Sequence, residues 1–324
     1  MITVTNKEIY KKTLTFSLRG ALFDIAAFAV IIVCGVVGFI VAEKTTDIGA
    51  LGLVLGLIAG LVFFVLILRY VSYTYKAGQI AMMTKAVIEG SLPDDVLAEG
   101  KRVVKERFLT VAMYFGATRI IKMIFNELGR VLMRVGRAVG GKNGSSVAAI
   151  INMIVRTIVA YLCDCCLGWV FFRKDENAGK ATCEGAVIFF KHWKVFAENM
   201  GRVFGIGCIS LVSIGGVFAA VFYSIAARFP AAFATLANEL ASSGNLDDND
   251  SFLGDPTSLM IFTVLVCAVI VWGIIHSIFV KPFVLAGVLR NFLNSGKEDI
   301  PDETAFAMLD EKSNQFRKLH EGLL

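Results

Sequence analysis

Charge is scarce in this chain of 324 residues, because Asp, Glu, Lys and Arg together make up only 18% of it. A soluble protein of this length would carry nearer to about 25% charged residues and would divide into about two domains. Hydrophobic residues make up 56% of the chain, and its mean hydropathy is +0.69. This composition excludes an ordinary soluble protein and indicates a polytopic membrane protein.

Motifs that carry chemistry are also lacking. The three histidines, His192, His276 and His320, are scattered and have no metalloprotease spacing. The sequence has no P-loop, no GxSxG elbow and no Rossmann fingerprint, and no nucleophile can be paired with a base. We therefore expect no enzyme activity, no cofactor and no metal. His276 lies in an apolar run, where it is either a titrating group or a histidine whose hydrogen bonds are satisfied.

The seven cysteines are odd in number and lie mostly in apolar runs, where cysteine behaves as a small hydrophobic residue. No disulfide framework is implied. Cys163, Cys165 and Cys166 flank Asp164, but neighbouring helical residues point in different directions, which disfavours a metal site. Trp169 is predicted to be an interfacial anchor.

Apolar runs predict an all-α bundle of six transmembrane helices in three hairpins, since a span needs about 20 apolar residues. The predicted spans are 20–42, 48–68, 108–128, 146–172, 203–227 and 257–280. Three of them contain charges, and the first contains Asp24 alone. The third contains Arg119, Lys122 and Glu127, and the fourth contains Arg156 and Asp164.

The distribution of Lys and Arg sets the orientation, because basic segments stay on the cytoplasmic side. Segments 1–19, 69–107, 173–202 and 281–324 hold 4, 7, 6 and 6 Lys and Arg residues, whereas 229–256 has none. We expect a cytoplasmic N-terminal segment 1–19, a transmembrane domain 20–280 and a cytoplasmic helical tail 281–324. The protein would lie in the cell membrane with both termini cytoplasmic.

The chain between two cytoplasmic segments must cross the membrane twice or not at all. Two crossings give six spans and leave the basic residues after 128 outside, and no crossing gives four spans. Six spans are favoured, because 146–172 has only two charges and is a poor surface helix.

Arg156 and Asp164 stand about 12 Å apart along one helix and about 80° apart around it, so they cannot bridge each other. A charge facing lipid costs at least about 2.5–3.5 kcal/mol, so each needs a partner or a water-filled cavity. Arg119 and Asp24 are candidate partners. The functional interpretation is a ligand or ion pathway lined by Arg119, Arg156, Asp164 and Asp24, and the alternative is a set of interhelical ion pairs or an arginine that reaches the membrane surface.

Two further patterns recur at helical spacing. Arg130, Arg134 and Arg137 form a basic stripe that suits anionic lipid or another anion, or is a solvated helix face. Gly52, Gly56 and Gly60 recur at every fourth position, a helix-packing motif within one chain or between copies. Membrane lipids and a small-molecule substrate are the expected partners. Nucleic acid is not an expected partner, because the basic residues do not cluster on one face. Formation of a homo-oligomer is compatible with the sequence.

The cytoplasmic segments contain two similar helix starts. One has Ser91 as the capping hydroxyl before Pro93, with the acids Asp94 and Asp95 in the first turn, and the other repeats this polarity with Asp302 and Glu303. The two stretches share one order of parts, because an apolar helix and then a glycine come before each helix start. Either a parallel repeat or chance explains it. The tail is predicted to be a soluble helix under the membrane.

A resemblance rests on two stretches. They are Glu184-Gly185-Ala186 followed by Lys191, Trp193 and Glu198-Asn199-Met200-Gly201, and Gly90 with Pro93 after the second span. This order resembles uncharacterised bacterial six-span membrane proteins and the membrane domains of some glycerophosphodiester phosphodiesterases. The last hairpin more weakly resembles choline-transporter-like proteins. The first resemblance implies a six-helix fold without a known activity.

Two functions are compatible with these features. The first is a non-ATP-hydrolysing transporter or channel-like binder of a small polar or amphipathic solute or a lipid headgroup. The alternative is a structural or accessory membrane protein that recruits partners through cytoplasmic amphipathic helices.

Overall fold

The computed structural model describes residues 4–46, 49–65, 69–107, 119, 122–123, 144–243 and 255–322. These residues are almost all helical and include no strand, which confirms the predicted all-α class. They form two compact units, of which one comprises 1–200 with 282–324 and the other comprises 201–281. The C-terminal tail therefore belongs to the same unit as the N-terminal segment.

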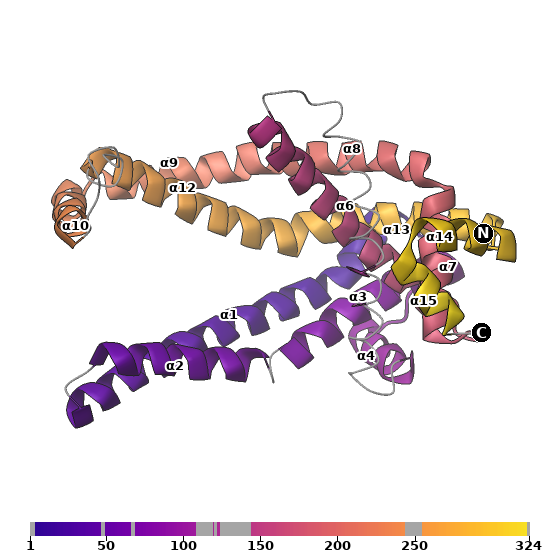
Figure 1. Cartoon of the computed structure of the whole chain (residues 1–324), viewed down its shortest axis with the longest axis horizontal. Helices are drawn as coiled ribbons and strands as arrows, with labels where there is room; N and C mark the ends of the chain where they lie inside the picture. Colours follow the sequence, from indigo (N-terminus) through magenta and orange to yellow (C-terminus); the bar gives the residue numbers. More distant parts are fainter. Residues whose placement is uncertain are drawn as a thin grey trace. The chain divides into compact units, whose positions relative to one another are not determined.

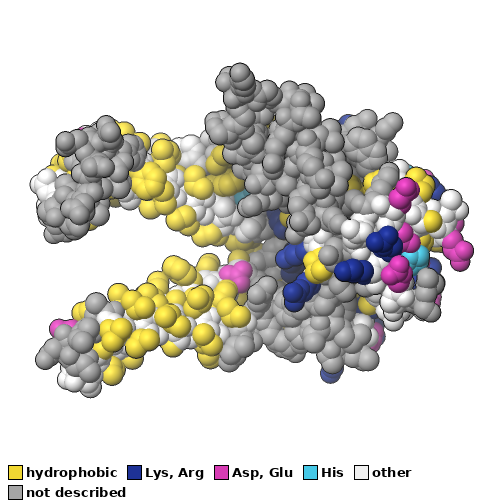
Figure 2. Space-filling model, in the orientation of Figure 1, with side chains coloured by type: hydrophobic (Ala, Val, Ile, Leu, Met, Phe, Trp, Pro, Cys, Tyr) yellow, Lys and Arg dark blue, Asp and Glu magenta, His cyan; other side chains and the backbone are white. Residues whose placement is uncertain are grey.

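An apolar hairpin forms one end of the first unit. Its helices α1 (Asn6–Thr46) and α2 (Gly49–Phe63) lie side by side (Figure 1). Hydrophobic side chains cover the visible face of this hairpin (Figure 2), and Leu22 and Phe28 are each 65% exposed. Apolar surface on this scale needs a lipid environment or a partner.

The glycines of α2 bring the two helix backbones into contact within the chain. Gly52 lies against Gly38, and Gly56 lies against Cys34. A methyl group added at Gly60 would stand 2.9 Å from the Ile31 Cα, closer than real side chains approach. Side chains at these three positions would push the helices apart.

The first turns of α1 belong to a packed core, although the same helix continues into the hairpin. Ile9, Thr13 and Phe16 are buried against α3 (Arg69–Glu89) and α4 (Val96–Arg107). The Phe16 ring lies in the space left by Gly78 and Gly100. The predicted N-terminal segment therefore forms about the first third of one continuous helix.

Helix α6 (Gly144–Phe172) is the centre of this core in its second half, where every residue from 161 to 171 is buried. It packs on α3 and on α7 (Ala178–Lys191). The stretch is made of cysteines, glycine and apolar residues around one acid, and a helix that is hydrophobic all round is a buried helix.

Asx and serine side chains start the short helices of the first unit. Asp95 accepts backbone N–H bonds at the start of α4, and Asp302 does so at the start of α14 (Glu303–Lys312). The tail is three helices rather than one, because Ser313 ends α14 and caps α15 (Asn314–Glu321) after α13 (Lys281–Glu298). Both α14 and α15 contact α7 (Figure 1).

The second unit is a helical hairpin with two π-helical turns. One arm runs from residue 201 through the second part of α8 (Trp193–Ser210), η2 (Leu211–Gly215) and α9 (Gly216–Ala226). The other runs through α12 (Pro256–Ile275) and η3 (His276–Val280). Helix α10 (Pro230–Ser243) follows the first arm, and α9 lies beside α12 (Figure 1).

Among the described residues, three helices are long and apolar enough to cross a membrane, at Asn6–Thr45, Gly201–Ala226 and Pro256–Glu298. They contain the predicted spans 20–42, 203–227 except its last residue, and 257–280. Shorter apolar helices, Leu51–Phe63 and Val159–Phe172, lie within the spans predicted at 48–68 and 146–172. The span predicted at 108–128 lies outside the described residues except at three positions, so the six-span topology stays a prediction.

Candidate functional site

The candidate site is the interface between α3 and α6, and its central feature is an ion pair. The Lys76 ammonium lies 2.7 Å from the Asp164 carboxylate. The Asp164 side chain is only 4% exposed, whereas that of Lys76 is 49% exposed. A lysine on the surface therefore reaches inward to a carboxylate in the core.

Small residues let the two helices approach each other closely at this interface. The Thr84 hydroxyl donates to the Gly168 carbonyl at 3.5 Å. A methyl group added at Gly168 would lie 3.0 Å from that hydroxyl oxygen. Glycine at this position therefore sets the spacing of α3 and α6 beside the ion pair.

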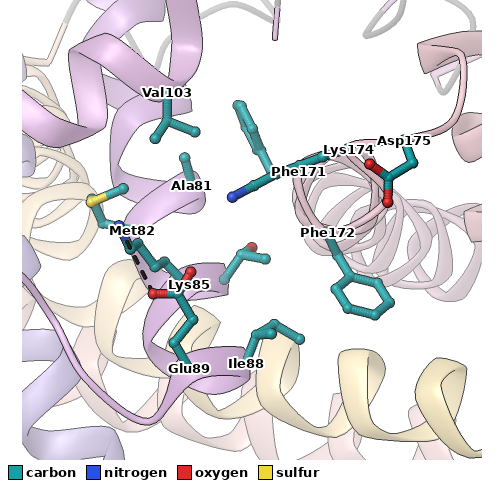
Figure 3. A pocket seen from close by; sticks show the side chains of 11 residues that line it. Ala81, Met82, Lys85, Ile88, Glu89, Val103, Phe171, Phe172, Lys174 and Asp175 are labelled. Atoms are coloured by element: carbon teal, nitrogen blue, oxygen red, sulfur yellow. Dashed lines mark ion pairs between the residues drawn. The ribbon is translucent and has the colours of Figure 1, made fainter. Parts of the chain in front are cut away.

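A cavity of about 200 Å³ lies further along the same interface (Figure 3). It is smaller than the range of about 300–1,000 Å³ that is usual for drug-sized ligands, and it suits a small solute. Its walls combine apolar and charged side chains. They are Ala81, Met82, Thr84, Lys85, Ile88, Glu89, Val103, Phe171, Phe172, Lys174 and Asp175.

Lys85 links the cavity wall to α4. Its ammonium lies 2.7 Å from the Glu99 carboxylate and 3.9 Å from that of Glu89. Arg102 also donates to Glu99, at 2.8 Å. Hydrogen bonds from Arg102 and Lys85 lower the pKa of Glu99 to about 2. Glu99 is thus ionised at neutral pH, so this ion pair is present under physiological conditions.

Arg107, the last residue of α4, holds the end of α6. Its guanidinium donates to the carbonyls of Val170 at 2.9 Å, Arg173 at 3.0 Å and Lys174 at 3.3 Å. The last carbonyls of a helix have no intrahelical donor, and a cation is favourable there. The cavity wall formed by this end of α6 is therefore fixed in place.

Glu184 of α7 is a second buried carboxylate, with a side chain that is 3% exposed. The Trp169 indole N–H and the Arg173 Nε each donate to it at 2.9 Å. The prediction of Trp169 as an interfacial anchor is wrong, because this side chain is fully buried and bonded to Glu184. In the sequence, the feature that indicates the contact of Glu184 with Trp169 and Arg173 is the presence of this acid within the apolar stretch of α7.

The predicted pathway residues lie in different environments in the structure. Asp164 is in the core and pairs with Lys76. This partner was not predicted from the sequence, because Lys76 lies in a segment predicted to be cytoplasmic. Asp24 is exposed on α1 and takes part in a contact, and Arg119 is exposed. Arg156 is helical, but its side chain lies outside the described part of the chain. The stripe of Arg130, Arg134 and Arg137 also lies outside it.

No group of three or more His, Cys, Asp or Glu side chains that could hold a metal ion occurs among the described residues. No family model, curated protein or solved structure matches the chain. The resemblance to six-span membrane proteins and to the membrane domains of phosphodiesterases therefore stays a prediction.

Proposed function

We propose that this membrane protein binds a small polar or amphipathic solute, or a lipid headgroup, at the α3–α6 interface and passes it without hydrolysing ATP. The observation that carries the proposal is the pairing of a core carboxylate, Asp164, with a half-exposed lysine, Lys76. We also propose that the chain is not an enzyme.

The energetics of the pair support a role beyond packing. A buried ion pair is often no more stabilising than an apolar pair of similar volume, because both charges lose hydration. Asp164 nevertheless lies among cysteines and apolar side chains. A retained charge in such a place is by default a candidate for ligand or ion contact.

The exposure of Lys76 gives the carboxylate a route to an external ligand. A lysine has a flexible stem and a compact ammonium, so it can move aside when another donor approaches. Asp164 would then accept hydrogen bonds from a cationic or hydroxyl group of the solute. The cavity lined by Thr84 and Lys85, further along the same interface and not lined by the ion pair, has space for a small molecule.

One observation favours the alternative, a structural or accessory protein that recruits partners through its cytoplasmic helices. The acids of the first unit make ion pairs within the chain, including Glu184 with Arg173 and Asp299 with Lys191. In that case Asp164 and Lys76 contribute to folding alone, and the exposed face of α4 carries the function.

The experiment is solute flux through the full chain in proteoliposomes. The probes are labelled n-butylammonium, glycerol and glycerol 3-phosphate, which represent a cation, a neutral polar solute and an anionic headgroup. We expect wild-type protein to accelerate the flux of at least one probe and Asp164→Asn to reduce this acceleration at least tenfold. Asp94→Asn is the control, because Asp94 is exposed in the loop before α4.

Two outcomes would reject the proposal. One is wild-type flux at the level of empty liposomes for all three probes. The other is equal acceleration by wild type and by correctly folded Asp164→Asn. Loss of folding in Asp164→Asn, with no flux in wild type and a defined protein co-purifying, would favour the accessory protein.

A further inference from the structure

The second unit holds three polar side chains inside its apolar hairpin. The Ser210 hydroxyl lies 3.1 Å from the His276 Nδ1 and receives the Trp272 indole N–H at 3.1 Å. The same hydroxyl donates to the Gly207 carbonyl at 2.8 Å. The rings of Trp272 and His276 lie 5.1 Å apart. These contacts join the two arms of the hairpin.

The backbone changes form on both arms at this level. The π-helical turn η2 begins directly after Ser210, and η3 begins at His276 itself. Such turns are rare and are frequently found at functional sites. The two wide turns coincide with the polar contact, which indicates a built feature rather than two separate irregularities.

The surroundings of the cluster are apolar. The most apolar windows of the two arms have mean hydropathies of 2.1 and 2.7, and only 17% of each is buried. His276 lies about 30 Å along the helix from Pro256, which is about the thickness of the bilayer hydrocarbon. It would therefore lie at the end of the span next to Lys281, within reach of water on the side predicted to be cytoplasmic.

The hydrogen-bond directions define the state of the neutral ring. The Ser210 hydroxyl has one proton, and the Gly207 carbonyl can only accept it, while the Trp272 N–H can only donate. The contact with His276 is then made by Nδ1–H as donor to the hydroxyl oxygen. The other ring nitrogen, Nε2, carries the lone pair that can accept a proton.

We propose that His276 is a proton-binding site of this hairpin. The proton adds to Nε2 and converts imidazole to imidazolium, Nδ1–H keeps its bond to Ser210, and no other bond changes. The charged and titratable side chains described on α8, α9, α12 and the start of α13 within this unit contain no carboxylate. They are Arg202, Cys208, Tyr223, Cys267 and Lys281. No acid among them holds the imidazolium permanently charged, so the site can bind and release a proton.

The direct test observes His276 alone. The variant His192→Gln/His320→Gln of the full chain leaves one histidine, whose ring is followed by NMR with labelled histidine in lipid nanodiscs. We expect the ring signal to titrate between about pH 5 and 8, the range of a histidine that exchanges protons with water. Ser210→Ala should shift the midpoint. Ser213→Ala should leave it unchanged, because Ser213 only donates to the Ile209 carbonyl of its own helix.

A ring signal that is constant over this pH range would overturn the proposal, and so would equal midpoints in Ser210→Ala and Ser213→Ala. Tryptophan fluorescence of the chain with all three histidines is an independent readout, because the centroid of the His276 ring lies 5.1 Å from that of the Trp272 ring. Its pH-dependent component should disappear in His276→Gln and persist in His192→Gln. Loss in His192→Gln instead would assign the signal to another site and contradict the proposal.

Discussion

Lys76 and Asp164 meet at 2.7 Å although they lie on different helices and are far apart in the sequence. Lys76 lies just after the first apolar hairpin, and Asp164 lies in the buried half of α6. The pair joins the segment that leaves this hairpin to the central helix of the core. Any ligand that separates the two charges would act on both segments.

Removal of the lysine should destabilise the first unit. Lys76→Met takes away the ammonium nearest the core carboxylate, and we expect the free energy of unfolding to fall by about 2–4 kcal/mol. The loss is at the lower end for a buried pair, because Lys76 is half exposed. Lys76→Met/Asp164→Leu should recover most of it in denaturant unfolding. A double variant as unstable as the single one would show that the pair is not the cause.

The glycines of α2 should be intolerant of side chains. Gly56→Leu places a branched side chain against the backbone around Cys34, and we expect a loss of about 1–3 kcal/mol from overpacking. Ala59→Leu is the control, because Ala59 is exposed on the same helix. The measurement is unfolding of the reconstituted protein by a denaturing detergent. Similar resistance of the two variants would contradict the close packing of α1 and α2.

The arginine at the end of α4 should contribute more than its neighbours. Arg107→Ala leaves three carbonyls at the end of α6 without their guanidinium donor, at about 1 kcal/mol for each hydrogen bond. We expect a loss of about 2–3 kcal/mol, whereas Lys105→Ala on the exposed face should change stability by less than about 0.5 kcal/mol. Thermal unfolding measures both. Faster amide exchange at 170–174 in Arg107→Ala would locate the effect.

Acid should weaken the contact between α3 and α4 through Glu99. The pKa of Glu99 in the folded chain, about 2, is below its ordinary value of 4.5, so its contribution to stability is full above pH 4.5. The contribution is lost as the pH falls from 4.5 through about 2. The difference in unfolding midpoint between wild type and Glu99→Gln should shrink over this range. Glu311→Gln, an exposed control, should show no such trend.

Patterns within one helix could be predicted from the sequence, and contacts between distant helices could not. The glycine spacing of α2 and the helix starts near Asp95 and Asp302 depend on local chemistry, and the structure places these residues at a helix contact and at helix starts. The cap of α4 is nevertheless Asp95 and not the predicted Ser91 hydroxyl, because the helix begins only at Val96. The partner of Asp164 depends on tertiary packing. Lys76 could not be predicted from the spans alone, because it lies in a segment predicted to be cytoplasmic. In this fold, buried residues occur in such segments as well.

The polar cluster of the second unit was hidden for a related reason. Ser210 and His276 lie in two separate apolar runs, and neither has a motif around it. Their contact depends on the register of the two arms, which π-helical turns alter locally. Periodicity based on 3.6 residues per turn does not anticipate such turns.

Helix α1 has a mechanical consequence. Its first turns are fixed in the core by Ile9 and Phe16, and its 41 residues continue without interruption to Thr46 in the apolar hairpin. At 1.5 Å per residue it is a rod of about 60 Å. A small tilt at the core end becomes a displacement several times larger at the far tip, so this helix is a lever arm between the packed core and the far end of the apolar hairpin.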